Sequence, residues 1–337
     1  MRFSSFFFLF LCAPFVGLSQ LLGGSNGFNF IQLPNNPQLS ALGGINISSR
    51  TSDIGLCFNN PALLRADMNG QLQAVFNSLY AGIKSYSLVA GYANEKLRTN
   101  FGMGVNYLDY GSLDQTDPSG NILGRFHPRD YLLQLFASRR YEEHWHYGLT
   151  IKFMQSKYGS FQSTALAMDA AGSYYDSSRL MQASIVIGNM GVQLQEFVAG
   201  NYEQLPFDIQ IGLSKRLSKA PIQFSITAHH LYKFDLAYND TLYNGNPGQK
   251  SNLFTVDKVF QHFVFGAQFY IDEKIELSAG YNRLRRTELR VENSANGLTG
   301  CSMGLGFISR KLQIRYARSW YQNNIAYNQF GLNVVLF

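Results

Sequence analysis

Most of this chain alternates apolar and polar residues with a period of two, the pattern of a β-strand with one dry face and one wet face. Stretch 101–107 carries Phe, Met, Val and Tyr at odd positions, with Gly and Asn between them. The same alternation recurs in 147–153, 207–214, 222–229 and 275–282. A chain built this way folds into β-sheet, and its apolar face must meet either a core or lipid.

The number and length of these stretches favour a membrane barrel. Together they predict about fourteen strands of roughly ten residues, the length that crosses a bilayer core at a tilt. An even count suits an all-β, antiparallel transmembrane barrel that closes on itself. The predicted strands are 71–80, 83–93, 99–109, 129–140, 145–156, 164–175, 179–188, 206–216, 221–233, 261–271, 274–285, 300–308, 311–321 and 327–337.

The lengths of the connections between these strands depend on whether the preceding strand is odd- or even-numbered. Those after even-numbered strands are short, whereas the long connections 110–128, 189–205, 234–260 and 286–299 all follow odd-numbered strands. A soluble sandwich or propeller has no reason for this sorting, but an outer-membrane barrel has tight periplasmic turns and longer outside loops. We therefore expect an integral protein of the outer membrane whose long loops face outside.

Composition supports the same class. Charged residues make up 15% of the chain, against a typical value of about 25%, and aromatic residues another 15%. This composition excludes disorder and fits coiled coils poorly. The net charge of +6 comes without a Lys/Arg run suited to a phosphate backbone, so nucleic acid is not an expected partner. Several tyrosines fall near predicted strand ends, where amphipathic rings favour a membrane interface: Tyr80, Tyr92, Tyr107, Tyr131, Tyr174, Tyr281 and Tyr327.

The first residues have the features of a secretory signal peptide. A basic Arg2 precedes an apolar run that starts at Phe6, and small residues end the pattern at Ser19. We expect a signal peptide over 1–19 with cleavage after Ser19. The apolar run is shorter than the roughly 20 residues of a membrane anchor, and the bulky Leu11 before Cys12 does not fit a lipid-attachment motif.

Residues 20–69 form a separate segment that does not alternate. They are rich in Gly, Asn and Pro, and include a Pro-Asn-Asn-Pro stretch at 34–37. Irregular backbone cannot cross lipid, because its polar groups would lack partners there. The segment is therefore expected in the periplasm or inside the lumen as a plug, followed by the barrel over 70–337.

A motif in this segment carries a family resemblance. Asn60, Pro61 and Ala62, followed by about fourteen strands, resemble the FadL-like long-chain fatty-acid transporters, whose plug carries an Asn-Pro-Ala motif. A fuller pattern is similar to the PorQ family of the type IX secretion system, with the related PorV family second. This pattern consists of Gly23, Gly24, Phe28, Phe30, Leu33, Pro34, Ala41, Leu42, Gly43, Gly44, Asp53 and residues 59–64.

The resemblance implies a role that alternation alone does not show. It implies a non-enzymatic outer-membrane anchor that holds a PorZ-like surface protein in an attachment complex, beside the sortase PorU and its anchor PorV. The FadL-like fold also implies an alternative, a transporter of hydrophobic small molecules. A lumen filled by polar side chains and plug backbone would argue against that alternative.

The last predicted strand looks like the C-terminal signal that the barrel-assembly machinery reads. Phe330, Leu332, Val334 and Leu336 share one face, with Gly331 on the other. The terminal aromatic residue, Phe337, is one position out of phase with the apolar face.

Other motifs have plainer interpretations. Gly23, Ser25 and Gly27 match the pattern of a nucleophile elbow, but they lie just after the predicted cleavage site, without the strand that the elbow requires. The loop from Asp235 to Asp257 is rich in Asn and Asp but lacks the spacing of a calcium loop. We expect no catalytic residues and no cofactor.

Polar residues on the inward faces are interpreted as lumen polarity. The pairs His144 with His146 and His229 with His230 suggest a metal site, but ordinary lumen polarity is the better account of both. Charged residues of the polar face are expected to form a lumen network or to line a pathway: Lys152, Asp208, Glu276 and Arg315. Cys57 and Cys301 remain after cleavage, and export permits a disulfide that their spacing does not indicate.

Overall fold

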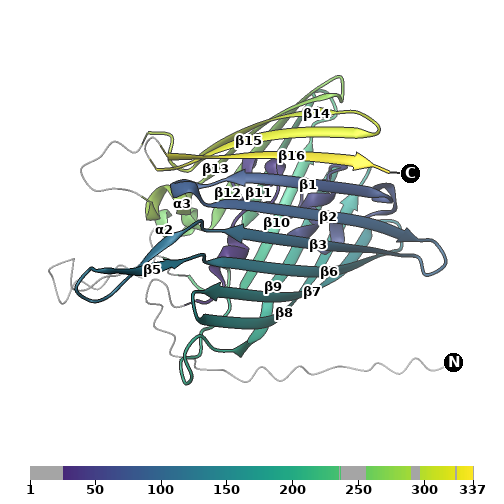
Figure 1. Ribbon diagram of the computed structural model, residues 1–337. Coiled ribbons are helices and arrows are strands. Elements are labelled where there is room, and N and C mark those ends of the chain that lie inside the picture. The colour runs from purple at the N-terminus through teal and green to yellow at the C-terminus, as the bar shows by residue number, and fades with distance from the viewer. Residues whose placement is uncertain (1–25, 235, 237–255, 290–296, 323–324, 337) are drawn as a thin grey trace.

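Fourteen strands close into one antiparallel barrel in the computed structural model of this protein (Figure 1). The ring closes where β1 pairs with both β2 and the last strand, β16. The predicted closed barrel of fourteen strands is therefore confirmed. The structure describes residues 26–234, 236, 256–289, 297–322 and 325–336, so the predicted signal peptide and Phe337 lie outside it.

The barrel strands follow the order of the chain. They are β1 (Gln71–Ser78), β2 (Lys84–Asn94), β3 (Thr99–Asp109), β6 (Arg129–Tyr141), β7 (Trp145–Tyr158), β8 (Phe161–Asp176), β9 (Met181–Gln195), β10 (Asp208–Arg216), β11 (Ile222–Ala228), β12 (Phe263–Ile271), β13 (Ile275–Asn282), β14 (Cys301–Ile308), β15 (Leu312–Gln322) and β16 (Ile325–Val335). A separate two-stranded sheet consists of β4 (Leu113–Thr116) and β5 (Ile122–Phe126).

Several predicted strand ends were wrong. The strand predicted to reach residue 233, β11, ends at Ala228, and local causes can be named for the errors in β9 and β13. β9 continues past residue 188 to Gln195, because Asn189 takes a left-handed conformation (φ 58°) beside a bulge, and pairing with β8 then resumes out of phase. β13 stops at Asn282 rather than at 285. The Asn282 side chain accepts a hydrogen bond from the Arg285 backbone N–H at 2.9 Å and caps the helix α3 (Arg283–Glu288).

The predicted loop 110–128 contains the β4–β5 hairpin. Its turn is built by Asp117, whose carboxylate accepts hydrogen bonds from the backbone N–H groups of Ser119 and Asn121 at 2.9 and 2.8 Å. The hairpin, α3 and α2 (Val256–Gln261) lie together at the left end of the barrel in Figure 1, and the C-terminus lies at the other end. We call these the long-loop end and the short-turn end.

Apolar side chains face outward from the barrel, as the alternation predicts. Phe101, Ile151, Ile211 and Leu277 are 38, 55, 50 and 43% exposed. The polar residues between them on the same strands are mostly buried on the inside. An apolar exterior around a polar interior is the arrangement that a bilayer requires.

Aromatic rings mark two levels on the outer surface. A row of neighbouring rings runs across β1, β2, β3 and β6 near the long-loop end: Phe76, Tyr86, Tyr107 and Tyr131, with successive centroids 5.4, 6.2 and 4.9 Å apart. At the short-turn end, Trp145 packs on Tyr174 at 5.1 Å. Tyr131 pairs with Gln155 in register, and the ten residue steps from 145 to 155 rise roughly 25 Å along a tilted strand. That height matches the apolar band of an outer-membrane barrel.

The chain before β1 lies inside the barrel, where it appears in purple in Figure 1. We call its described part, residues 26–70, the N-terminal segment. Most of its side chains from Pro34 to Arg65 are buried. Among the described residues, no helix is long and apolar enough to span a membrane. The remaining helices are η1 (Asn29–Gln32), α1 (Pro37–Ala41), η2 (Ile54–Phe58), η3 (Pro61–Leu63), η4 (Ala66–Met68) and η5 (Tyr80–Gly82).

Candidate functional site

A buried charge cluster joins the N-terminal segment to the barrel wall. Arg315 of β15 forms ion pairs with Asp53 at 3.0 Å and with Glu276 of β13 at 3.3 Å. All three side chains are at most 3% exposed. Gln38 donates to Glu276 at 3.0 Å, and Gln73 of β1 donates to Asp53 at 2.8 Å. Removing the cation would leave two carboxylates buried without a counter-charge.

Helix α1 is held in place by its cap and by the wall. The Asn36 side chain accepts hydrogen bonds from the backbone N–H groups of Gln38 and Leu39 at 2.7 and 3.1 Å, and Pro37 occupies the first helical position. The Ser302 hydroxyl of β14 then donates to the carbonyl of Ala41 at 2.9 Å. Local capping signals in the sequence therefore place this helix, and serines of the wall hold it.

The Asn-Pro-Ala residues form a second attachment on the opposite strands. The Asn60 side chain accepts from the Ala62 N–H at 2.9 Å, which caps η3 with Pro61 at its start. Its amide donates to the carbonyl of Ile47 at 2.7 Å and to the Ser173 hydroxyl of β8 at 3.2 Å. The structure thus gives this motif a structural setting inside the barrel, with Asn60 fully buried.

Gly148 of β7 provides the space for η3. A Cβ at this position would lie 2.6 Å from both the Ala62 nitrogen and the Pro61 carbonyl carbon. We expect Gly148→Ala to lower the free energy of unfolding by about 1–3 kcal/mol, because backbone atoms must shift to admit the methyl group. Urea-induced unfolding followed by tryptophan fluorescence would measure this loss. Gly124→Ala in β5 is the control, since nothing lies within 4 Å of its Cβ, and equal midpoints for the two variants would contradict the prediction.

Among the described residues, two cavities of mixed polar and apolar lining lie at opposite ends of the lumen and share no lining residue. The cavity at the short-turn end has a volume of about 340 Å³ and is lined by Arg50, Arg65, Arg216 and Glu273 among others. Burial, and then the charge of Arg65, lower the pKa of Arg50 to about 10. The cavity at the long-loop end has a volume of about 300 Å³ and mixes charged and apolar side chains. The N-terminal segment contributes to the lining of both.

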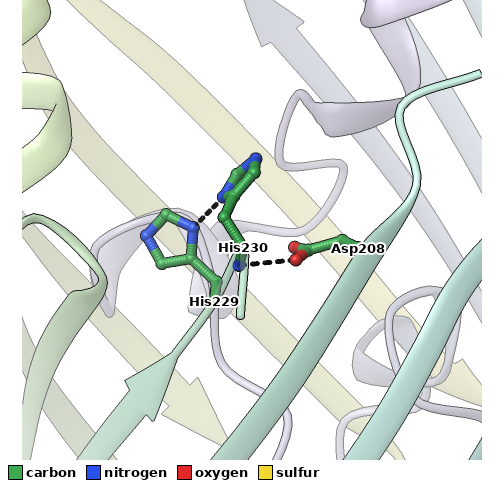
Figure 2. A group of neighbouring side chains, drawn as sticks. All are labelled: Asp208, His229 and His230. Carbon is green, nitrogen blue, oxygen red and sulfur yellow. Dashed lines mark hydrogen bonds between the residues drawn. The ribbon is translucent and has the colours of Figure 1, made fainter. Parts of the chain in front are cut away.

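The long-loop cavity contains a group of charged and histidine side chains that come from different strands. Lys152 and Asp169 form an ion pair at 2.7 Å. Beside them, Asp208, at the start of β10, approaches His229 and His230, which follow β11 (Figure 2). The Nδ1 atoms of the two histidines face each other, and the Asp208 carboxylate accepts the His230 backbone N–H at 2.6 Å.

The remaining predicted residues are dispersed. His146 is buried on the inner face, and a ring nitrogen of His144 contacts the carbonyl of Tyr175 at 2.8 Å. Cys57 and Cys301 are both free thiols. Burial raises the pKa of the Cys57 thiol, and its sulfur lies 4.0 Å from that of Met68. These residues form no joint site.

The apolar residues of the predicted C-terminal assembly signal lie on the outer surface wherever the structure describes them. Phe330, Leu332 and Leu336 are 47, 38 and 60% exposed on the outer face of β16 and just beyond it. Gly331 faces inward against Pro37. The nucleophile-elbow serine, Ser25, and most of the loop from Asp235 to Asp257 lie outside the described residues.

Comparison with known proteins finds likeness in solved structures alone. No protein-family description matches the chain, and no curated protein matches it. The CymD monoaromatic hydrocarbon channel has a TM-score of 0.50 and 13% identity, over 91% of this chain and 97% of that one. A FadL homologue of Pseudomonas aeruginosa has a TM-score of 0.48 and 10% identity, over 90% and 98%. The likeness to CymD is one of fold.

Proposed function

We propose that this protein is a non-enzymatic outer-membrane barrel that anchors a surface protein at its long-loop end. The observation that carries the proposal is the filled lumen. The N-terminal segment is tied to strands on different sides of the barrel by the Arg315 cluster, by α1 and by Asn60. A barrel filled in this way is a rigid base for its loops rather than an open passage.

The long-loop end is the surface that we propose for the partner. It carries the β4–β5 hairpin, α2 and α3, whereas the other end carries short turns (Figure 1). The hairpin exposes Leu113, Ile122 and Leu123 at 45, 66 and 65%, and exposed apolar groups of this kind are common in protein-binding surfaces. By resemblance to the PorQ family, we propose a PorZ-like surface protein of the type IX secretion system as the partner, with PorU and PorV in the same complex.

Deleting the gene in its native host tests this function. We expect the surface partner to appear in the medium instead of on the cells, measured by quantitative proteomics of both fractions. Replacing residues 113–126 with a short Gly-Asn turn is expected to release the same protein while the barrel stays in the membrane. The matched control alters 95–98 at the short-turn end, which should retain the partner. Retention of every surface protein by the deletion strain would contradict the proposal.

A second candidate is a channel for hydrophobic small molecules, which the fold likeness to the CymD channel favours. The two functions differ in a binding experiment with the purified protein in detergent. An anchor with this lumen should show no saturable binding of a monoaromatic hydrocarbon. Saturable binding that disappears when the long-loop cavity is altered would favour the channel.

A further inference from the structure

The histidine and aspartate group of the long-loop cavity has the ligands of a metal site. One oxygen of Asp208 and one ring nitrogen from each of His229 and His230 all lie within 4.8 Å of one another. Asp208 and His229 are 6 and 1% exposed, and His230 is half-buried. Two imidazoles and a carboxylate form a donor set that suits zinc and other divalent transition metals.

The backbone brings the two rings together. Successive residues of a strand point to opposite faces, so neighbouring histidines would normally diverge. His230, the second residue after β11, adopts a left-handed conformation (φ 55°), and its ring thereby turns toward the ring of His229. Figure 2 shows the two rings facing each other, with the Asp208 carboxylate directed at the backbone nitrogen of His230.

The ligands are held in position by further contacts. Gln210 donates to the second oxygen of Asp208 at 2.8 Å, and the Asp208 carboxylate also accepts the His230 backbone N–H. The backbone N–H of His229 donates to the carbonyl of His262 at 2.9 Å. Both ring nitrogens of His262 face carbonyl oxygens, at 2.8 and 3.1 Å, which keeps this third histidine out of the ligand set.

A further observation points to a ligand at this place. The Nε2 atom of His229 is buried and has no hydrogen-bond partner among the described residues, although the residue lines the cavity. Pairing between the two Nδ1 atoms satisfies one nitrogen of each ring and does not involve the Asp208 carboxylate. A divalent cation would engage all three side chains at once, with the half-buried His230 ring rotating to admit bonds of about 2.0–2.1 Å.

We propose that Asp208, His229 and His230 bind one divalent transition-metal ion of the zinc class. The ion would join the first residue of β10 to the chain that leaves β11, and so fix the base of the connection between β11 and β12 at the long-loop end. The remaining coordination position would face the cavity. This proposal rests on the three side chains and does not depend on the proposed anchoring function.

Zinc binding to the mature protein in detergent tests the proposal. The chain is purified without a histidine tag, treated with a chelator, dialysed and titrated with Zn²⁺ against a chromophoric competitor. We expect saturation at one equivalent. Co²⁺ in place of Zn²⁺ is expected to give the visible ligand-field bands of a site with nitrogen ligands. No saturable binding near one equivalent would overturn the proposal.

Variants show whether these residues hold the ion. His229→Gln and Asp208→Asn are each expected to raise the Kd for Zn²⁺ at least tenfold, and His127→Gln, which changes an exposed histidine outside the cavity, should leave it unchanged. Circular dichroism of each variant checks the fold. If either buried substitution unfolds the barrel, the variant His230→Gln of the half-buried histidine provides the test. It is expected to leave the barrel folded and to weaken Zn²⁺ binding. Wild-type affinity in folded His229→Gln or His230→Gln would overturn the assignment.

Discussion

Replacing Arg315 with Met is expected to lower the free energy of unfolding by about 3–5 kcal/mol. The substitution removes the cation that lies between Asp53 and Glu276 and leaves both carboxylates buried. Because Asp53 belongs to the N-terminal segment, we also expect that segment to become more accessible to proteases. Urea-induced unfolding in lipid vesicles, followed by the fluorescence of the tryptophans, would measure the loss.

Two further variants separate charge from packing. Arg310→Met changes an exposed arginine in the turn before the same strand and should shift the free energy of unfolding by no more than about 0.5 kcal/mol. The triple variant with Arg315→Met, Asp53→Asn and Glu276→Gln removes the unpaired charges together with the cation, and should recover most of the stability. Equal losses in the single and triple variants would show that the cluster matters for its shape and not for its charge.

An arginine at Ile151 is expected to lower stability in a bilayer by about 2–4 kcal/mol, because it places a charge on the lipid face near the membrane midplane. Ile151 is 55% exposed and lies between Trp145 and Gln155, which mark the two aromatic levels on β7. The free energy of unfolding from lipid vesicles, measured against the unaltered chain, gives the cost.

The control for Ile151→Arg uses the depth dependence of the same change. Leu194 is 60% exposed and is the second-last residue of β9 on the long-loop side. An arginine at this strand end reaches the membrane interface and should cost about 0–1 kcal/mol. Equal costs at the two positions would mean that this wall does not cross a bilayer at the proposed depth.

The barrel could be predicted from the sequence because the pattern that defines each strand is local. Alternation within a strand shows which residues face outward, and the outward orientation of Ile151 and Leu277 follows directly from it. The misplaced strand ends have a local cause of another kind. At Asn189 the backbone changes conformation and shifts the phase of β9, and at Asn282 a side-chain cap starts a helix inside an apparently continuous strand. Neither event changes the residue composition of its stretch enough to be recognised from the period-two pattern.

The interior contacts could not be predicted, because they join residues that are distant in the chain. Glu276 and Arg315 were recognisable as polar-face positions and Asp53 only as part of the family pattern, and pairing the three requires the curvature and register of the closed sheet. The approach of Asp208 to His229 and His230 depends in addition on one left-handed residue at the end of a strand. Alternation alone predicts that neighbouring histidines point apart.

The enclosure of the N-terminal segment has a consequence for the order of assembly. Pro34 accepts a hydrogen bond from Gln329 of β16, a partner 295 positions later in the chain. The N-terminal segment therefore gains its last contacts with the wall only when the final strand joins the first one, although Asn60 already contacts Ser173 of β8. Pairings between residues so distant in the chain are slow to form. Pairing of β1 with β16 therefore both closes the barrel and completes the enclosure of the N-terminal segment.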